Sequence, residues 1–114
     1  MNLDTILLQL RKEYVATLPE KIQTIRHFFN SGDALGCKEV FHKLKGTGAT
    51  YGIPEISEIG EALEAYVKSH PNDLKSAVPD ALELLNQVHL HRLQDKPFAP
   101  ATDTRFIRIK SRLG

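Results

Sequence analysis

The side chains best suited to group-transfer chemistry lie together in residues 41–52, FHKLKGTGATYG. His42 supplies an imidazole, which acts as a nucleophile and proton acceptor near neutral pH. Lys43 and Lys45 place positive charge beside any anionic group on the ring. Gly46 removes a side chain next to them, at a cost of about 1 kcal/mol relative to alanine if the stretch is helical. The combination indicates either a loop or a helix face that another macromolecule must approach.

A helix through residues 33–51 would separate this stretch into two faces. At about 100° per residue, the stripe that faces the core consists of Cys37, Phe41, Leu44, Gly48 and Tyr51. His42 lies roughly 150° from the centre of that stripe and is therefore predicted to face solvent. The residues around it on the outer face are Lys38, Lys43, Lys45, Gly46 and Ala49. An exposed imidazole among lysines suits the acceptance or carriage of a phosphoryl group.

The elements that must position His42 also read as amphipathic helices. Apolar residues recur at three- and four-residue steps in residues 3–18, 22–29, 56–67 and 74–93. Pro19 kinks or splits the first helix, Asp33 suits an N-cap, and Pro54 fits the first turn of a later helix. That later helix places its glutamates largely on the outer side, namely Glu55, Glu58, Glu61 and Glu64. We predict an all-α fold over residues 1–94, an up-and-down antiparallel four-helix bundle with a kinked or split N-terminal helix.

The end of the chain does not continue this pattern. Residues 95–114 contain the helix-breaking pairs Lys96-Pro97 and Ala99-Pro100 and then TRFIRIKSR, which mixes apolar and basic residues. Five bases against two acids give this segment a surplus of three positive charges, although the whole chain is formally +1. We expect a basic, irregular C-terminal tail or linker, and the alternative is a docking segment or an edge strand.

Composition excludes several classes of protein. The 114 residues suffice for one domain with a modest core, and the nearly balanced charge gives no electrostatic case for binding nucleic acid or a membrane surface. Cys37 is the only cysteine, so no internal disulfide can form. No signal peptide or bilayer-spanning apolar run is present. We predict a soluble, cytoplasmic monomer.

Other kinds of site fit the sequence less well. A phosphate-binding P-loop has its lysine after the glycines, whereas here the lysines precede them. The dinucleotide fingerprint fails because the third glycine stands at position 52 rather than 51, and no strand precedes it. His89 and His91 are two residues apart and so lie on different helix faces. We therefore predict no metal site.

The segment His42-Lys43-Leu44-Lys45-Gly46, followed by small residues and Gly52, resembles the H-x-L-K-G signature of histidine phosphotransfer (HPt) domains. The resemblance is detailed over residues 33–64 and extends over residues 3–93 as the helix pattern of that family's four-helix bundle. HPt domains carry phosphate between the receiver domains of two-component phosphorelays. The resemblance therefore implies a phosphocarrier.

Individual roles follow from the same resemblance. His42 would be the phosphoacceptor, taking phosphate from one receiver's aspartate and giving it to another's. Lys45 would steady the phosphoryl group, Lys43 would add charge at the rim, and Gly46 would let the receiver approach. Glu64 stands where members of the family often have a glutamine that hydrogen-bonds the imidazole, so it is expected to orient the ring.

The resemblance also implies the partners. These are response-regulator receiver domains, or a hybrid histidine kinase that contains one. Mg²⁺ is expected on the receiver, so this chain needs no cofactor of its own. An ATP-binding domain does not fit beside a bundle in 114 residues, so histidine kinase activity is not expected. The sequence leaves two functions open: a phosphocarrier acting through His42, and a helical docking module that binds receivers or other partners without being phosphorylated.

Overall fold

The structure is a computed structural model that describes residues 2–113, and in this range it contains helices and turns and no strand. The all-α prediction is therefore confirmed. The α-helices are α1 (Leu3–Ala16), α2 (Leu18–Asn30), α3 (Ala34–Thr50), α4 (Pro54–Ser69), α5 (Val78–Leu93) and α6 (Thr104–Ser111). Two short 3₁₀ turns, η1 (Leu74–Ser76) and η2 (Pro100–Thr102), precede α5 and α6.

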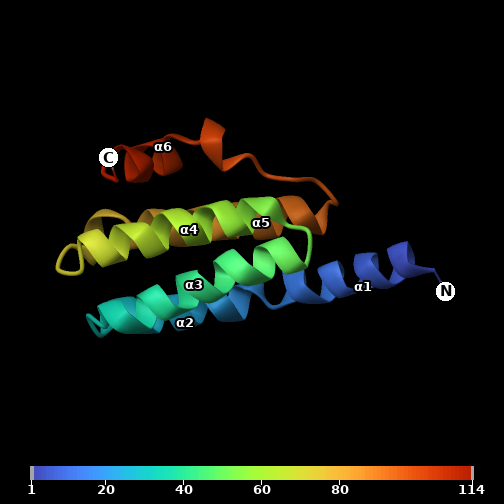
Figure 1. Cartoon of the computed structure of the whole chain (residues 1–114), viewed down its shortest axis with the longest axis horizontal. Coiled ribbons are helices and arrows are strands. Elements are labelled where there is room, and N and C mark those ends of the chain that lie inside the picture. Colours follow the sequence, from blue (N-terminus) through green and yellow to red (C-terminus); the bar gives the residue numbers. More distant parts are fainter. Residues whose placement is uncertain (1, 114) are drawn as a thin grey trace.

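The N-terminal helical region is split, as the sequence predicted. Thr17 separates α1 from α2, and Pro19 lies in the first turn of α2, where its missing N–H leaves no hydrogen bond unmade. The Thr17 hydroxyl donates to the Tyr14 carbonyl oxygen at 2.7 Å, which satisfies a carbonyl at the end of α1. The split lets α2 pack along α3 and α5 while α1 extends beyond them (Figure 1).

The core lies among α2, α3, α4 and α5. Each of these helices contributes side chains that are fully buried, and examples are Ile25, Phe41, Leu63 and Leu85. α2 contacts α3 and α5, and α4 contacts the same two helices, with the α3–α4 contact by far the most extensive. We refer to α2–α5 as the helical bundle.

The C-terminal segment is the main difference from the sequence-based expectation. An irregular tail was expected after residue 94, but residues 104–111 form α6, which packs on α4 and α5 (Figure 1). Phe106 and Ile109 belong to the buried core, three residues apart on one face of α6. Asp103 caps α6 by accepting a hydrogen bond from the Arg105 amide at 2.9 Å. The prolines lie before α6 and therefore do not interrupt it.

Glu55 also differs from its expected place on the outer side of α4. Its side chain is buried at the start of α4, beside Arg92 of α5. Burial alone would raise the pKa of Glu55, but hydrogen bonds from Arg92 and the Phe98 amide, together with the arginine's charge, lower that pKa below its usual value. A buried carboxylate thus stays ionised because two donors compensate for the lost water.

None of the helices within residues 2–113 is both long enough and apolar enough to cross a membrane.

Candidate functional site

Helix α3 presents His42 to solvent and holds the opposite face in the core. The helix begins after Asp33, whose side chain accepts a hydrogen bond from the Gly36 amide at 2.8 Å. It ends before Gly52, whose φ of +72° is the left-handed conformation that favours glycine after a helix. The His42 side chain is 73% exposed, whereas Phe41 and Leu44 are buried. The two faces predicted from the helical periodicity are confirmed.

His42 is joined to Glu64 of α4. The imidazole Nδ1 and the Glu64 Oε2 lie 2.6 Å apart, and the glutamate side chain is only 22% exposed. An ionised carboxylate can only accept hydrogen bonds, so the tautomer that fits this contact has its hydrogen on Nδ1. In the neutral ring, Nε2 then has a free lone pair on the exposed side. The contact therefore fixes both the orientation of the ring and the nitrogen that is available for reaction.

Two glycines make the close approach of α3 and α4 possible. A Cβ placed on Gly48 would lie 2.5 Å from the Ser57 amide nitrogen and 3.0 Å from the Ile53 carbonyl oxygen. A Cβ placed on Gly60 would lie 2.7 Å from the Phe41 carbonyl oxygen, in the turn of α3 just before His42. Any side chain at either position would push the two helices apart. The predicted position of Gly48 on the face of α3 that packs in the core is confirmed, whereas the sequence predicted no role for Gly60.

Gly46 occupies a different environment from Gly48. Nothing lies within 4 Å of the position that a Cβ would occupy there, and Gly46 is exposed one turn after His42. Ala49 is exposed further along α3. The backbone of this part of the helix is therefore bare on the side that His42 faces. No packing requirement within the described residues explains a glycine at position 46.

Lysines from two helices surround the histidine. A shallow depression of about 380 Å³ lies over the α3–α4 contact and is lined by Leu35, Lys38, Glu39, His42, Lys43, Glu64 and Lys68. Lys45 lies beyond it, with its Nζ 3.9 Å from the Glu61 Oε1. Lys68 was missed by sequence reasoning, although it stands one turn after Glu64 and so shares its face of α4. The sequence indicates that Lys68 belongs to the surface around His42 only if the register of α3 against α4 is already known.

The remaining candidates for chemistry are less favourable. Burial raises the pKa of the Cys37 thiol to about 11, so the group is a neutral core side chain at physiological pH. A larger hollow of about 530 Å³ lies between α1 and the end of α5, but no histidine, serine or cysteine lines it. Within residues 2–113, no three histidine, cysteine or carboxylate side chains are grouped so as to hold a metal ion.

The arrangement defines an all-α protein with one oriented, solvent-facing histidine in a lysine-rich surface. Comparison with protein families matches residues 9–95 to the model described as the Hpt domain. The match covers most of the chain, and the protein therefore belongs to the Hpt domain family. Hpt domains are phosphotransfer modules of two-component phosphorelays and interact with response-regulator receiver domains. Comparisons with curated proteins and with solved structures gave no match.

Proposed function

We propose that this chain is a phosphocarrier that accepts a phosphoryl group on His42 from a receiver-domain aspartate and passes it to a second receiver. One observation supports this proposal above the others: His42 is held through Nδ1 by Glu64 at 2.6 Å while its ring is mostly exposed. Such a histidine presents Nε2 in one orientation to an incoming partner.

The proposed transfer is a direct exchange between Nε2 and a carboxylate oxygen. The Nε2 lone pair attacks the phosphorus of an aspartyl phosphate, the bond from phosphorus to the aspartate oxygen breaks, and the aspartate leaves as a carboxylate. The imidazole becomes positively charged because Nδ1 keeps its hydrogen. Glu64, in contact with that nitrogen, balances the charge. In the return step the second receiver's aspartate attacks phosphorus, and the electron pair of the N–P bond goes back to Nε2. Mg²⁺ is expected on the receiver.

The lysines are proposed to offset the repulsion between Glu64 and the phosphoryl group. Lys38, Lys43 and Lys68 line the depression around His42, and Lys45 stands at its edge. A phosphoryl group carries up to two negative charges, and ammonium groups within a few ångströms compensate for them. Gly46 is proposed to admit the receiver's backbone, because the space beside it is open.

We propose an up-and-down four-helix topology on the basis of the contacts between the helices. α2 and α4 each pack against α3 and α5, and three- to eight-residue connections join α2 to α5 in sequence. Short connections of this kind produce an up-and-down antiparallel arrangement. In that arrangement α3 and α4 lie side by side, which agrees with the contact between His42 of α3 and Glu64 of α4.

The test is phosphorylation of the purified chain. We expect acid-labile, base-stable phosphate after incubation with a phosphorylated receiver, or with phosphoramidate, a small donor that needs no protein partner. His42→Gln should abolish the label, whereas His27→Gln, which changes an exposed histidine of α2, should leave it intact. Nitrogen-15 NMR of the phosphorylated ring should place phosphorus on Nε2. Receiver binding without any label on the wild type would instead support the docking module, and label on His42→Gln would refute the assigned site.

A further inference from the structure

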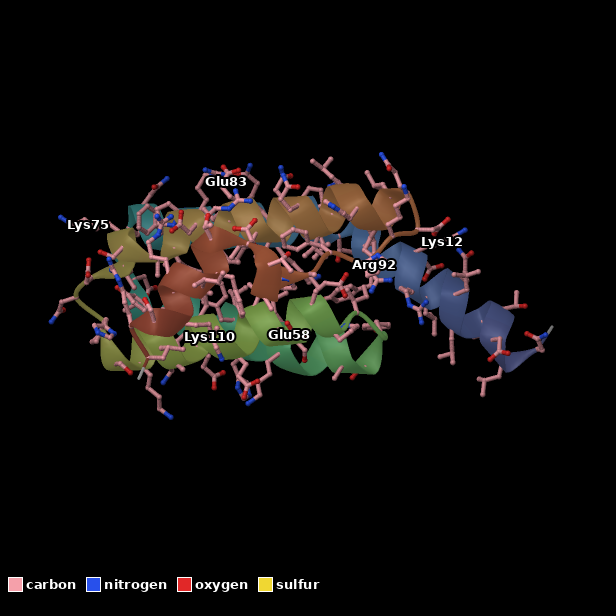
Figure 2. All side chains as sticks on the ribbon, turned by 90° about the horizontal axis from the view of Figure 1, so that it is seen from above. Lys12, Glu58, Lys75, Glu83, Arg92 and Lys110 are labelled. Atoms are coloured by element: carbon pink, nitrogen blue, oxygen red, sulfur yellow. The ribbon has the colours of Figure 1, made fainter. Side chains whose placement is uncertain are left out.

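The outer half of α1 exposes an unusual concentration of apolar side chains. Leu3, Ile6, Leu7, Leu8 and Leu10 lie within eight consecutive residues, and their exposed fractions range from 39% to 67%. α1 extends past the end of the helical bundle, so these side chains have few neighbours (Figures 1 and 2). Contiguous apolar surface of this kind in a soluble domain marks an interaction site.

The apolar residues of α1 include a stripe that fits another helix. Leu3, Leu7 and Leu10 follow the alternating four- and three-residue spacing of helix–helix seams. The next position of the seam is Tyr14, which is buried and stacks on Tyr51 with ring centroids 4.8 Å apart. The same face of α1 is therefore packed at its base and bare toward its tip. A partner helix laid along the bare part would continue the packing that Tyr51 begins.

The charges beside the stripe identify the partner. Asp4 and Arg11 each follow a stripe leucine by one position and so lie on the same flank, two turns apart. Within residues 2–113 neither forms an ion pair, and the Arg11 Nε donates to the Tyr51 carbonyl oxygen at 3.0 Å, beside the stripe. If two α1 helices pair antiparallel, Asp4 of each copy faces Arg11 of the other. In a parallel pair the two copies of this flank lie on opposite sides of the seam, so the contact between Asp4 and Arg11 cannot form.

We infer that a second copy of this chain covers the stripe, through antiparallel pairing of the two α1 helices. The pairing is self-complementary about a two-fold axis, which is the usual symmetry of homodimers. The interface is limited to a few turns, so it falls below the roughly 1,200 Å² typical of stable complexes, and the dimer forms in a concentration-dependent way. His42 stays accessible in this dimer. At a rise of 1.5 Å per residue it lies about 12 Å before the end of α3, and the exposed part of α1 extends beyond that end.

Sedimentation equilibrium tests the dimer. From about 1 µM to about 1 mM, the mass should rise from the 12.8 kDa of one chain toward twice that value. Leu7→Asp should weaken association about tenfold or more. Ile107→Asp is the matched control, because Ile107 is similarly exposed at 52% but lies on α6. A wild type that stays monomeric to about 1 mM, or a dimer unaffected by Leu7→Asp, would overturn the inference.

Charge exchange tests the antiparallel direction. Asp4→Arg alone and Arg11→Asp alone should each weaken self-association, because each creates two like-charge contacts. An equimolar mixture of the two variants should associate again, since both cross-contacts are then between opposite charges. Thermal unfolding of each variant checks that the loss of the Arg11–Tyr51 hydrogen bond leaves the fold intact. Failure of the mixture to associate would overturn the antiparallel pairing. The inference would also be overturned if the wild type does not self-associate and Leu7→Asp weakens the binding of a receiver.

Discussion

Glu55 at the start of α4 and Arg92 near the end of α5 form the most deeply buried ion pair within residues 2–113. The Arg92 Nε donates to Oε2 at 2.9 Å and Nη2 donates to Oε1 at 2.7 Å. The Phe98 amide donates to the same carboxylate at 2.9 Å. One carboxylate therefore joins α4, α5 and the segment that leads to α6. Figure 2 shows Arg92 at the end of the bundle where α1 begins to extend, near Lys12.

Loss of the arginine should be costly. Arg92→Ala leaves the Glu55 carboxylate buried without its charged donor, and breaking a buried pair in this way typically costs about 3–5 kcal/mol. Urea unfolding followed by circular dichroism measures the change in the free energy of unfolding. Arg26→Ala, at an exposed position of α2, serves as the control and should change that free energy by less than about 0.5 kcal/mol. Equal effects of the two substitutions would contradict a structural role for the pair.

The same pair predicts how stability depends on pH. Because the pKa of Glu55 is lowered in the folded protein, its contribution is fully present above the ordinary glutamate pKa of about 4.3 and disappears as the pH falls through the lowered value. Hydrogen bonds from Arg105 and Ser76 similarly lower the pKa values of Asp103 and Asp73, so they add to the acid sensitivity. Urea midpoints between pH 2 and 7 should therefore decline more gently in Glu55→Gln than in the wild type. Parallel curves would show that Glu55 does not titrate as argued.

Substitution of Gly46 and of Gly48 by alanine should change the stability of the protein in opposite directions. Gly46→Ala adds a methyl group in open space within a helix and should stabilise the protein by about 0.5–1 kcal/mol. Gly48→Ala forces a methyl group against the backbone of α4 and should destabilise it by about 1–3 kcal/mol or more. Thermal unfolding of the two variants side by side provides the comparison. Effects of the same sign would refute the division between a free and a packed glycine.

Glu64 should matter for reactivity more than for stability. Glu64→Ala removes the acceptor of the Nδ1 hydrogen bond and, if His42 is the phosphoacceptor, should slow its phosphorylation by about 10-fold or more, as with other residues that orient a functional imidazole. Glu64→Gln keeps an acceptor oxygen and should cause a smaller loss. Rapid-quench measurements with a phosphorylated receiver give the rate constants. If both variants react at the wild-type rate, the Glu64 contact has no role in transfer.

Helix α6 should behave as part of the core. Phe106→Ala removes a buried ring and should lower the free energy of unfolding by about 3–5 kcal/mol. Ile107→Ala, at the neighbouring exposed position, should have little effect. The pair is to be compared by urea unfolding of the full chain. A Phe106→Ala variant as stable as Ile107→Ala would mean that α6 is only loosely attached.

Features confined to one helix could be predicted from the sequence. The exposed side of α3, its cap at Asp33 and its end at Gly52 depend on residues a few positions apart, so helical periodicity and turn chemistry suffice. The division of the helix between Phe41 in the core and His42 in solvent is of this kind. The role of His42 as phosphoacceptor remains a prediction.

Features that depend on the alignment of separate helices could not be predicted. Lys68 joins the surface around His42 only because α3 and α4 run side by side in a particular register. α6 has only eight residues and is too short to be stable alone, so its helical state depends on burying Phe106 and Ile109. The apolar pattern of α1 predicts a helix, but periodicity does not tell which of its turns another helix covers.

The contact between Gly60 and the turn of α3 before His42 has a spectroscopic consequence. Because the separation of α3 and α4 there leaves no room for a methyl group, the His42 Nδ1–Glu64 Oε2 distance is coupled to the spacing of the two helix backbones. A hydrogen held in a short contact with a carboxylate resonates far downfield in a proton spectrum. The chemical shift of the Nδ1 proton therefore reports the separation of the two helices. Temperature, pressure or a bound partner that loosens the α3–α4 contact could be followed at this one signal without adding a label.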